Sequence, residues 1–226
     1  MSGMPGTTAG TVHAPDDASG VPFRIIAVAG DVRRIGHIAE LASRWAGIPF
    51  GLMLRDPGHR PASVELLAAH ALSCRLPANL TLMTNFRRVA GIRWVHCTSA
   101  QLGEPDHREI SAGAGPGRFG CSVHDVGEAR RAVAAGAAYV TFSPIFPTGS
   151  KPGHPGAGME ALRDICSMIQ IPVFALGGVT AGRVVPVLEA GAYGIASISL
   201  FDPMATVSLD DLLERLAERW RDEGRR

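Results

Sequence analysis

A chain of 226 residues, 46% of them hydrophobic, is long enough for one sizeable core and lies in the size range of a single α/β domain. Its 22 Lys and Arg side chains nearly balance 21 Asp and Glu side chains, and a net charge of +1 gives no reason to expect a nucleic-acid or polybasic membrane partner. Any anion site must therefore be local.

The first segment, residues 1–21, contains mainly small and polar residues and lacks the apolar core of a secretory signal. We expect it to form a disordered tail. No stretch approaches the ~18 apolar residues that a membrane span needs, so we expect a cytoplasmic protein without a membrane partner. Four cysteines, Cys74, Cys97, Cys121 and Cys166, are widely spaced without a Cys-x-x-Cys pair, which favours buried free thiols over a disulfide framework or a zinc site.

From Phe23 onward, short β-rich runs alternate with helical patterns, which indicates a parallel sheet with crossover helices. The runs are almost continuously apolar, as expected of strands that are covered on both faces. Apolar residues at helical spacing between Leu209 and Trp220 predict a final helix that packs on the domain. The predicted strands are residues 23–29, 50–54, 80–84, 92–96, 118–123, 139–143, 173–176 and 194–199.

Eight βα units predict a lean (β/α)8 TIM barrel, a single compact α/β domain over residues 22–221, followed by a short tail at residues 222–226. A doubly wound open sheet is the alternative. We favour the barrel because no Gly-x-Gly-x-x-Gly follows the first strand and because eight units are present. In a barrel, the functional groups lie at the C-terminal ends of the strands and in the loops that follow them.

The loops after the seventh and eighth predicted strands are "LGGVT" and "SISLF". Barrel enzymes often bind phosphate at these two places through backbone N–H groups. Gly177 and Gly178 would let the backbone approach an anion closely, and Ser199 could add a hydroxyl donor. The alternative is that the paired glycines only form a tight turn.

The loop after the sixth strand, "SPIFPTGSK", brings Thr148, Ser150 and Lys151 within four residues. Two hydroxyls and an ammonium suit a phosphate or a diphosphate, although an incidental lysine in a surface turn is the alternative. The Gly- and Pro-rich residues that follow suit a mobile flap, in which we expect His154 to face solvent.

The fifth strand ends in "CSVHD", which would place Ser122 and His124 on the same face. His124 is the best candidate proton carrier, because imidazole titrates near neutral pH and this position would open onto the barrel mouth. Capping of the next helix is its alternative role. His96 is a weaker candidate, and Arg55 could orient an anion or simply pair with Asp56.

At these residues the chain resembles the superfamily of thiamine phosphate synthases and thiazole tautomerases, which are compact (β/α)8 barrels. The resemblance covers residues 23–203 and is most specific in "SPIFPTGSK", "IPVFALGGVT" and "EAGAYGIASIS". It implies a phosphorylated thiazole as the small-molecule substrate and leaves a homo-oligomer open. The residues that it implies for the thiazole phosphate are Thr148, Ser150, Gly178, Ile198 and Ser199.

The resemblance is weaker in the half of the site that binds a diphosphate. Synthases that resemble this chain hold Mg²⁺ with two Asp residues, and here Phe86 and Gln101 replace both carboxylates. Mg²⁺ prefers oxygen ligands, which a phenylalanine side chain cannot supply. We therefore expect no metal site and no cofactor, with Mg²⁺ needed only by a synthase. Four residues of the family pattern persist, namely Arg55, Asn85, Ser122 and Lys151, whereas Met53 and Pro57 replace a Gln and a Lys.

The missing carboxylates favour the tautomerase branch. A synthase expels diphosphate and needs help with the developing charge, whereas a tautomerase only moves a proton. The expected function is a thiazole tautomerase-like isomerase that acts on a carboxylated thiazole phosphate, with His124 in the acid/base role that the resemblance implies. An atypical thiamine phosphate synthase is the first alternative, and a non-catalytic, regulatory thiazole phosphate-binding protein is the second.

Overall fold

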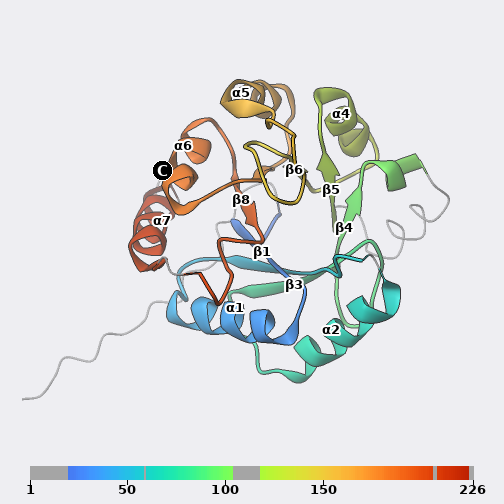
Figure 1. The fold of residues 1–226 in the computed structure, drawn as a ribbon, viewed down its shortest axis with the longest axis vertical. Coiled ribbons are helices and arrows are strands. Elements are labelled where there is room, and N and C mark those ends of the chain that lie inside the picture. The colour runs from blue at the N-terminus through green and yellow to red at the C-terminus, as the bar shows by residue number, and fades with distance from the viewer. Residues whose placement is uncertain (1–19, 59, 104–117, 206–207, 224–226) are drawn as a thin grey trace, which may run out of the picture.

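The computed structural model describes residues 20–58, 60–103, 118–205 and 208–223, and its strands close into a ring (Figure 1). All eight strands are parallel, each pairs with the next in the chain, and β8 pairs with β1. This order confirms the predicted barrel and excludes the open sheet. The strands are β1 (Ile25–Ala29), β2 (Phe50–Leu54), β3 (Leu80–Asn85), β4 (Trp94–Thr98), β5 (Phe119–Val123), β6 (Tyr139–Phe142), β7 (Val173–Leu176) and β8 (Gly194–Ser197).

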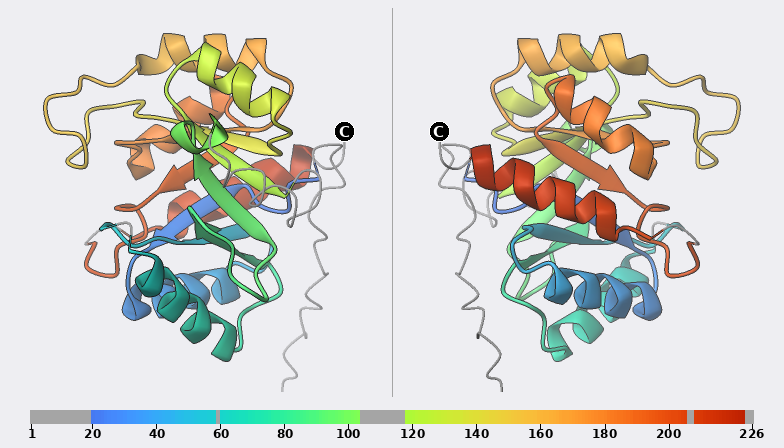
Figure 2. Two further views of the ribbon diagram at one scale, coloured as in Figure 1. Left: turned by 90° about the vertical axis from the view of Figure 1, so that its right-hand side faces the viewer. Right: turned by 90° about the vertical axis from the view of Figure 1, so that its left-hand side faces the viewer.

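Helices surround the ring on its outer side (Figures 1 and 2). Side chains cap two of them, because Asp31 accepts a hydrogen bond from Arg34 N and Asp125 accepts one from Glu128 N. The last helix buries Leu212, Leu213, Leu216 and Trp220, which confirms its predicted apolar face. The helices are α1 (Val32–Arg44), α2 (Pro61–Ser73), α4 (Val126–Ala134), α5 (Gly158–Met168), α6 (Ala181–Glu189) and α7 (Asp210–Glu223), with a 3₁₀ turn, η1 (Ala100–Gly103).

The interior of the barrel is closed by aromatic side chains. The Phe23 ring lies 5.2 Å from the Trp94 ring and 5.3 Å from the Tyr139 ring, both edge to face. Tyr139 fits because it lies beside Gly120, where a Cβ atom would stand 2.0 Å from the Tyr139 ring. This packed layer forms a floor. Any ligand must therefore enter from the opposite end of the barrel, where the C-terminal ends of the strands lie.

Several sequence-based details are corrected by the structure. The fourth strand begins at Trp94 rather than Ile92, because Ile92 N bonds to Val89 O in a turn that contains Gly91. Cys97 and Cys121 are buried as expected, but Cys74 is exposed; all four thiols are free. Within the described ranges, no helix is long and apolar enough to cross a membrane.

Most of the two predicted tails lies outside the described residues, namely residues 1–19 and 224–226. Val21 at the start of the described chain is buried in the barrel interior, and residues 222–223 belong to α7. The proposed boundaries of the domain therefore stay a prediction.

Candidate functional site

A cavity of about 310 Å³ lies at the C-terminal ends of the strands. The loops after β2, β6 and β8 project toward this end of the barrel (Figure 2). All the site residues that we predicted line the cavity, although their roles stay predictions: Arg55, Asn85, Ser122, His124, Thr148, Ser150, Lys151, Gly177, Gly178, Ile198 and Ser199.

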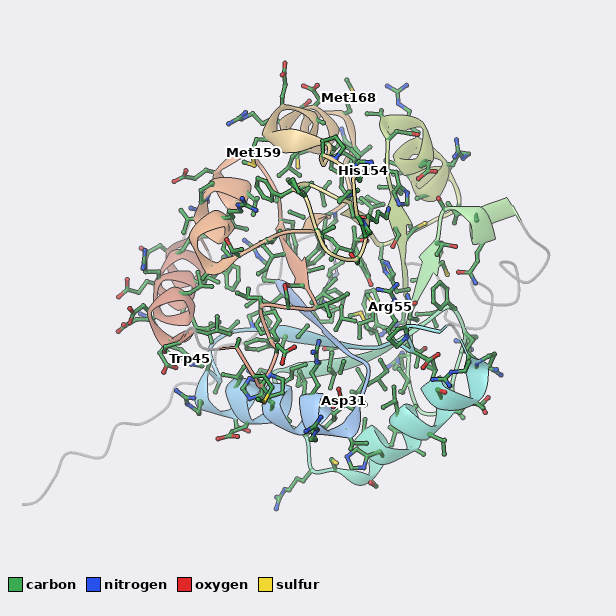
Figure 3. All side chains as sticks on the ribbon, viewed as in Figure 1. Asp31, Trp45, Arg55, His154, Met159 and Met168 are labelled. Carbon is green, nitrogen blue, oxygen red and sulfur yellow. The ribbon has the colours of Figure 1, made fainter. Side chains whose placement is uncertain are left out.

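Arg55 follows β2 (Figure 3). Its backbone N–H donates a hydrogen bond to Ala29 O. Its guanidinium is half-buried, forms no ion pair with a described residue, and has its pKa lowered by burial. Asp56 is engaged elsewhere, since both of its carboxylate oxygens bond to Arg60, which lowers the Asp56 pKa to about 2. Arg55 is thus a cation that lines the cavity without a counter-charge among the described residues, and the expected alternative of an Arg55–Asp56 pair is wrong.

Lys151 is the only lysine among the 226 residues, and it lies at the rim of the same cavity. Its backbone N–H bonds to Thr148 O, and the hydroxyls of Thr148 and Ser150 are 3.2 Å apart. This part of the rim therefore presents two hydroxyls and one ammonium, which are donors that suit a phosphate group. His154 lies farther along the same loop and is exposed, as predicted (Figure 3).

Gly177 and Gly178 have positive φ angles of 96° and 64° and let two loops pack against each other. A Cβ atom on Gly177 would lie 2.8 Å from Pro144 Cα, and one on Gly178 would lie 2.5 Å from Pro147 O. Both glycines therefore serve the tight turn that we considered as the alternative. The same close approach leaves their backbone exposed to the cavity.

Buried polar side chains lie below this rim, which sequence reasoning largely missed. Thr141 and Ser143 on and after β6 line the cavity, and their only sequence signal is a hydroxyl in each of two positions of an apolar strand. His96 is buried, with Nε2 2.8 Å from Ser122 Oγ. Burial, and then the charge of Arg55, lowers the His96 pKa to about 3, so this imidazole is neutral at physiological pH.

His124 reaches the rim but is tied to the helix that follows it. Its Nδ1 atom lies 3.0 Å from Glu128 Oε2, and its backbone N–H donates to the same oxygen. Burial alone would raise the Glu128 pKa, but the hydrogen bonds from His124 and Ser99, together with the charge of His124, lower it. The geometry agrees with the helix-terminal role that we considered as the alternative.

The family pattern implies Mg²⁺, and the described residues do not fit this ion. Phe86 lines the cavity at the position of one lost carboxylate. Gln101 at the other position is occupied, because Oε1 accepts from Thr98 N at 2.9 Å and Nε2 donates to Phe86 O at 3.2 Å. No group of three or more His, Cys, Asp or Glu side chains in the described ranges could hold a metal ion.

Comparison with known proteins decides the family. A sequence model described as "Thiamine monophosphate synthase" matches residues 85–201. A thiamine-phosphate synthase of Methanoregula boonei is 40% identical over 204 residues, which cover 86% of this chain and 93% of that protein. The chain belongs to the thiamine monophosphate synthase family.

Other relatives and solved structures agree with this assignment. The thiamine-phosphate synthase of Methanoculleus marisnigri is 40% identical over 60% of this chain, and the match spans 64% of that relative. A putative thiamine-phosphate synthase of Geobacter sulfurreducens is 40% identical over 59% of this chain and 63% of its own length. The thiamine phosphate pyrophosphorylase of Pyrococcus furiosus has a TM-score of 0.61 at 20% identity, covering 88% of this chain and 96% of that one, which supports the fold alone.

These findings overturn the expected tautomerase. Relatives that match this family member over most of its length are named thiamine-phosphate synthases, so the isomerase with His124 as its acid/base is wrong. The prediction gave the loss of two carboxylates more weight than the similarity of the rest of the chain. The identity to a synthase extends over 204 residues. In the structure, His124 lines the cavity with its Nδ1 atom bonded to Glu128.

Proposed function

We propose that this family member is a thiamine-phosphate synthase, a transferase that joins a pyrimidine methyl diphosphate to the nitrogen of a thiazole phosphate. The half-buried Arg55 guanidinium, which has no ion-pair partner in the described chain, carries this proposal. A desolvated cation facing a cavity favours a strongly anionic ligand such as a diphosphate. The 40% identity to a named synthase over 204 residues supports the same reaction.

The two phosphorylated substrates would occupy different walls. The diphosphate would lie near Arg55 and Lys151, which are the two cations of the lining. The thiazole phosphate would lie on the loops after β6, β7 and β8, where Thr148, Gly178 and Ser199 offer hydroxyl and backbone groups. This arrangement would hold the thiazole ring and the pyrimidine methylene carbon above the aromatic floor, so that the two reacting atoms meet.

The reaction then needs no proton transfer. The lone pair of the thiazole nitrogen attacks the methylene carbon, the carbon–oxygen bond breaks, and its electron pair leaves with the diphosphate. Negative charge develops on the departing oxygen, where a guanidinium and an ammonium stabilise it. Arg55 and Lys151 are the groups of the described lining that can do this, and His124 has no chemical step to perform.

The test is a coupling assay with the purified full chain. We expect thiamine phosphate to form from a pyrimidine methyl diphosphate and thiazole phosphate, measured by chromatography with mass detection, in parallel with Mg²⁺ and with a chelator. Absence of product in both conditions would refute the synthase. Calorimetric binding of thiazole phosphate without any product would instead support the non-catalytic binder.

A further inference from the structure

A chain of hydrogen bonds runs from the cavity into the barrel floor. Ser122 Oγ, which borders the cavity, lies 2.8 Å from His96 Nε2 and 3.2 Å from Thr141 Oγ1. The other ring nitrogen, His96 Nδ1, lies 3.0 Å from the hydroxyl of Tyr139, and that hydroxyl donates to Met83 Sδ at 3.4 Å. Tyr139 and Met83 are fully buried. These contacts join the cavity lining to the inert floor of the barrel.

The direction of these hydrogen bonds follows from the donors and acceptors. A neutral imidazole has one N–H donor and one acceptor nitrogen. The Tyr139 hydroxyl lies 3.0 Å from His96 Nδ1 and 3.4 Å from Met83 Sδ, and a thioether sulfur can only accept. A hydroxyl that donates to Met83 Sδ accepts from His96, and this assignment places the hydrogen of His96 on Nδ1. Nε2 is then an acceptor, and Ser122 at 2.8 Å is a closer donor to it than Thr141 at 3.4 Å.

The charge of Arg55 favours the same tautomer. Nε2 faces Ser122 on the cavity side, where Arg55 also lies, whereas Nδ1 faces the buried floor. A lone pair rather than an N–H on the side of a nearby cation is electrostatically favourable, and burial strengthens the effect. The reverse tautomer would also leave Met83 Sδ without its donor.

We infer that Tyr139 and His96 are positioning residues that hold the hydroxyl hydrogen of Ser122 away from the cavity, so that Ser122 offers the ligand only a lone pair. One lone pair of Ser122 Oγ already accepts from Thr141, which leaves the other for the cavity. A ligand group that meets Ser122 must therefore donate a hydrogen bond. A ring amino group satisfies this requirement, whereas a ring carbonyl does not.

Asn85 supplies a second acceptor on the same wall. Its Nδ2 atom donates to His96 O at 3.3 Å and contacts Met53 Sδ, which sets the orientation of the amide. Its Oδ1 atom is buried and has no hydrogen-bond partner among the residues that the structure describes. An unsatisfied buried acceptor is costly, so a ligand that donates to it gains affinity. Ser122 Oγ and Asn85 Oδ1 are thus two acceptors on one wall of the cavity, and they favour a ligand that presents hydrogen-bond donors to this wall.

The first test reads the tautomer directly in the ligand-free protein. We expect ¹⁵N NMR to show His96 protonated on Nδ1 and bare on Nε2, with the signals assigned by their loss in His96→Gln. Tyr139→Phe removes the acceptor of the Nδ1 hydrogen and should move the proton to Nε2. Tyr193→Phe, the matched control, removes the other tyrosine hydroxyl of the chain and should leave the tautomer unchanged. A wild-type His96 protonated on Nε2 would overturn the inference, whether or not Tyr139→Phe folds.

The second test measures ligand selection and rests on the proposed function, because it uses pyrimidine diphosphates. Calorimetry should show the amino-substituted pyrimidine diphosphate binding about 10- to 100-fold more tightly than its oxo analogue. Tyr139→Phe should shrink this ratio, whereas Tyr193→Phe should retain it. If Tyr139→Phe lowers the affinity for both ligands by the same factor, the role of Tyr139 is merely structural and the inference is overturned. If neither compound binds, the proposed function fails, and the NMR tautomer still decides the inference.

Discussion

Arg55 contributes little to the stability of the ligand-free fold but is expected to contribute to substrate binding. A half-buried guanidinium without a described ion-pair partner gains little in the ligand-free fold, but it can stabilise a diphosphate. We expect Arg55→Gln to lower kcat/KM in the coupling reaction by about 10²- to 10³-fold while the melting temperature stays equal or rises. Steady-state kinetics and calorimetry measure the two effects. Arg60→Gln is the matched control. Because Arg60 pairs with Asp56, this substitution should leave kcat/KM nearly unchanged.

Lys151 permits a chemical test that few chains offer. Because it is the only lysine, an amine-reactive reagent such as trinitrobenzenesulfonate has one side-chain target in the entire sequence. We expect modification of Lys151 to be rapid, since the side chain is exposed, and to slow several-fold when thiazole phosphate or diphosphate is present. Peptide mass spectrometry follows the modified fraction, with the N-terminal amine as internal control. Equal protection of both amines, or protection of neither, would contradict a phosphate contact at Lys151.

At the level of elements, the site depends on how closely the loop after β7 packs on the loop after β6. Gly178→Ala would place a methyl group 2.5 Å from Pro147 O at a φ of 64°, so we expect a loss of about 1–3 kcal/mol in unfolding free energy and a raised KM for thiazole phosphate. Denaturant titration and kinetics measure these changes. The control is Gly182→Ala in the first turn of α6, where a new Cβ meets nothing within 4 Å. That change should be neutral or stabilising by up to about 1 kcal/mol.

The elements themselves were largely predictable because strands that are buried on both faces leave continuous apolar runs. β2 and β7 have the predicted bounds, β4 is shifted by two residues at both ends, and the other strands differ by one or two residues at one end. β4 is the instructive case: Ile92 is apolar and buried like a strand residue, yet it belongs to a turn closed by Val89. Hydrophobicity marks burial, and the backbone hydrogen bonds that separate a strand from a turn leave no comparable signal.

At the scale of the whole molecule, barrel topology explains why the site was predictable and the reaction was not. Closing eight parallel strands gathers all their C-terminal ends, so residues from β2 to β8 that were chosen separately line one cavity. The hydrogen-bond chain through Tyr139 was missed, because its contacts join residues 43 positions apart inside the barrel. The reaction was misassigned because the prediction relied on two positions, Phe86 and Gln101, where the metal-binding carboxylates of the family pattern are replaced. The identity to a synthase extends over most of the chain.

The free energy of unfolding should depend on pH because His96 is buried. The unfolded chain binds a proton at His96 below about pH 6.5, but the folded protein does so only near pH 3, because burial and Arg55 lower the pKa. The unfolded state therefore holds more protons between these values, and stability must fall as the pH falls through this window. Between pH 7 and pH 5 we expect His96 to cost about 2 kcal/mol of unfolding free energy, measured by urea titration at each pH.

The variants isolate this effect. His96→Gln cannot take up the proton in either state, so its stability should change by about 2 kcal/mol less over the same range, even if the variant is less stable at pH 7. His70→Gln is the control, because His70 is exposed on α2 and its replacement should leave the slope unchanged. Carboxylates titrate mainly below this range, so they contribute little to the comparison. An unaltered slope in His96→Gln would show that the buried imidazole gains a proton in the folded state, against the neutral ring that the contacts of Ser122 and Tyr139 require.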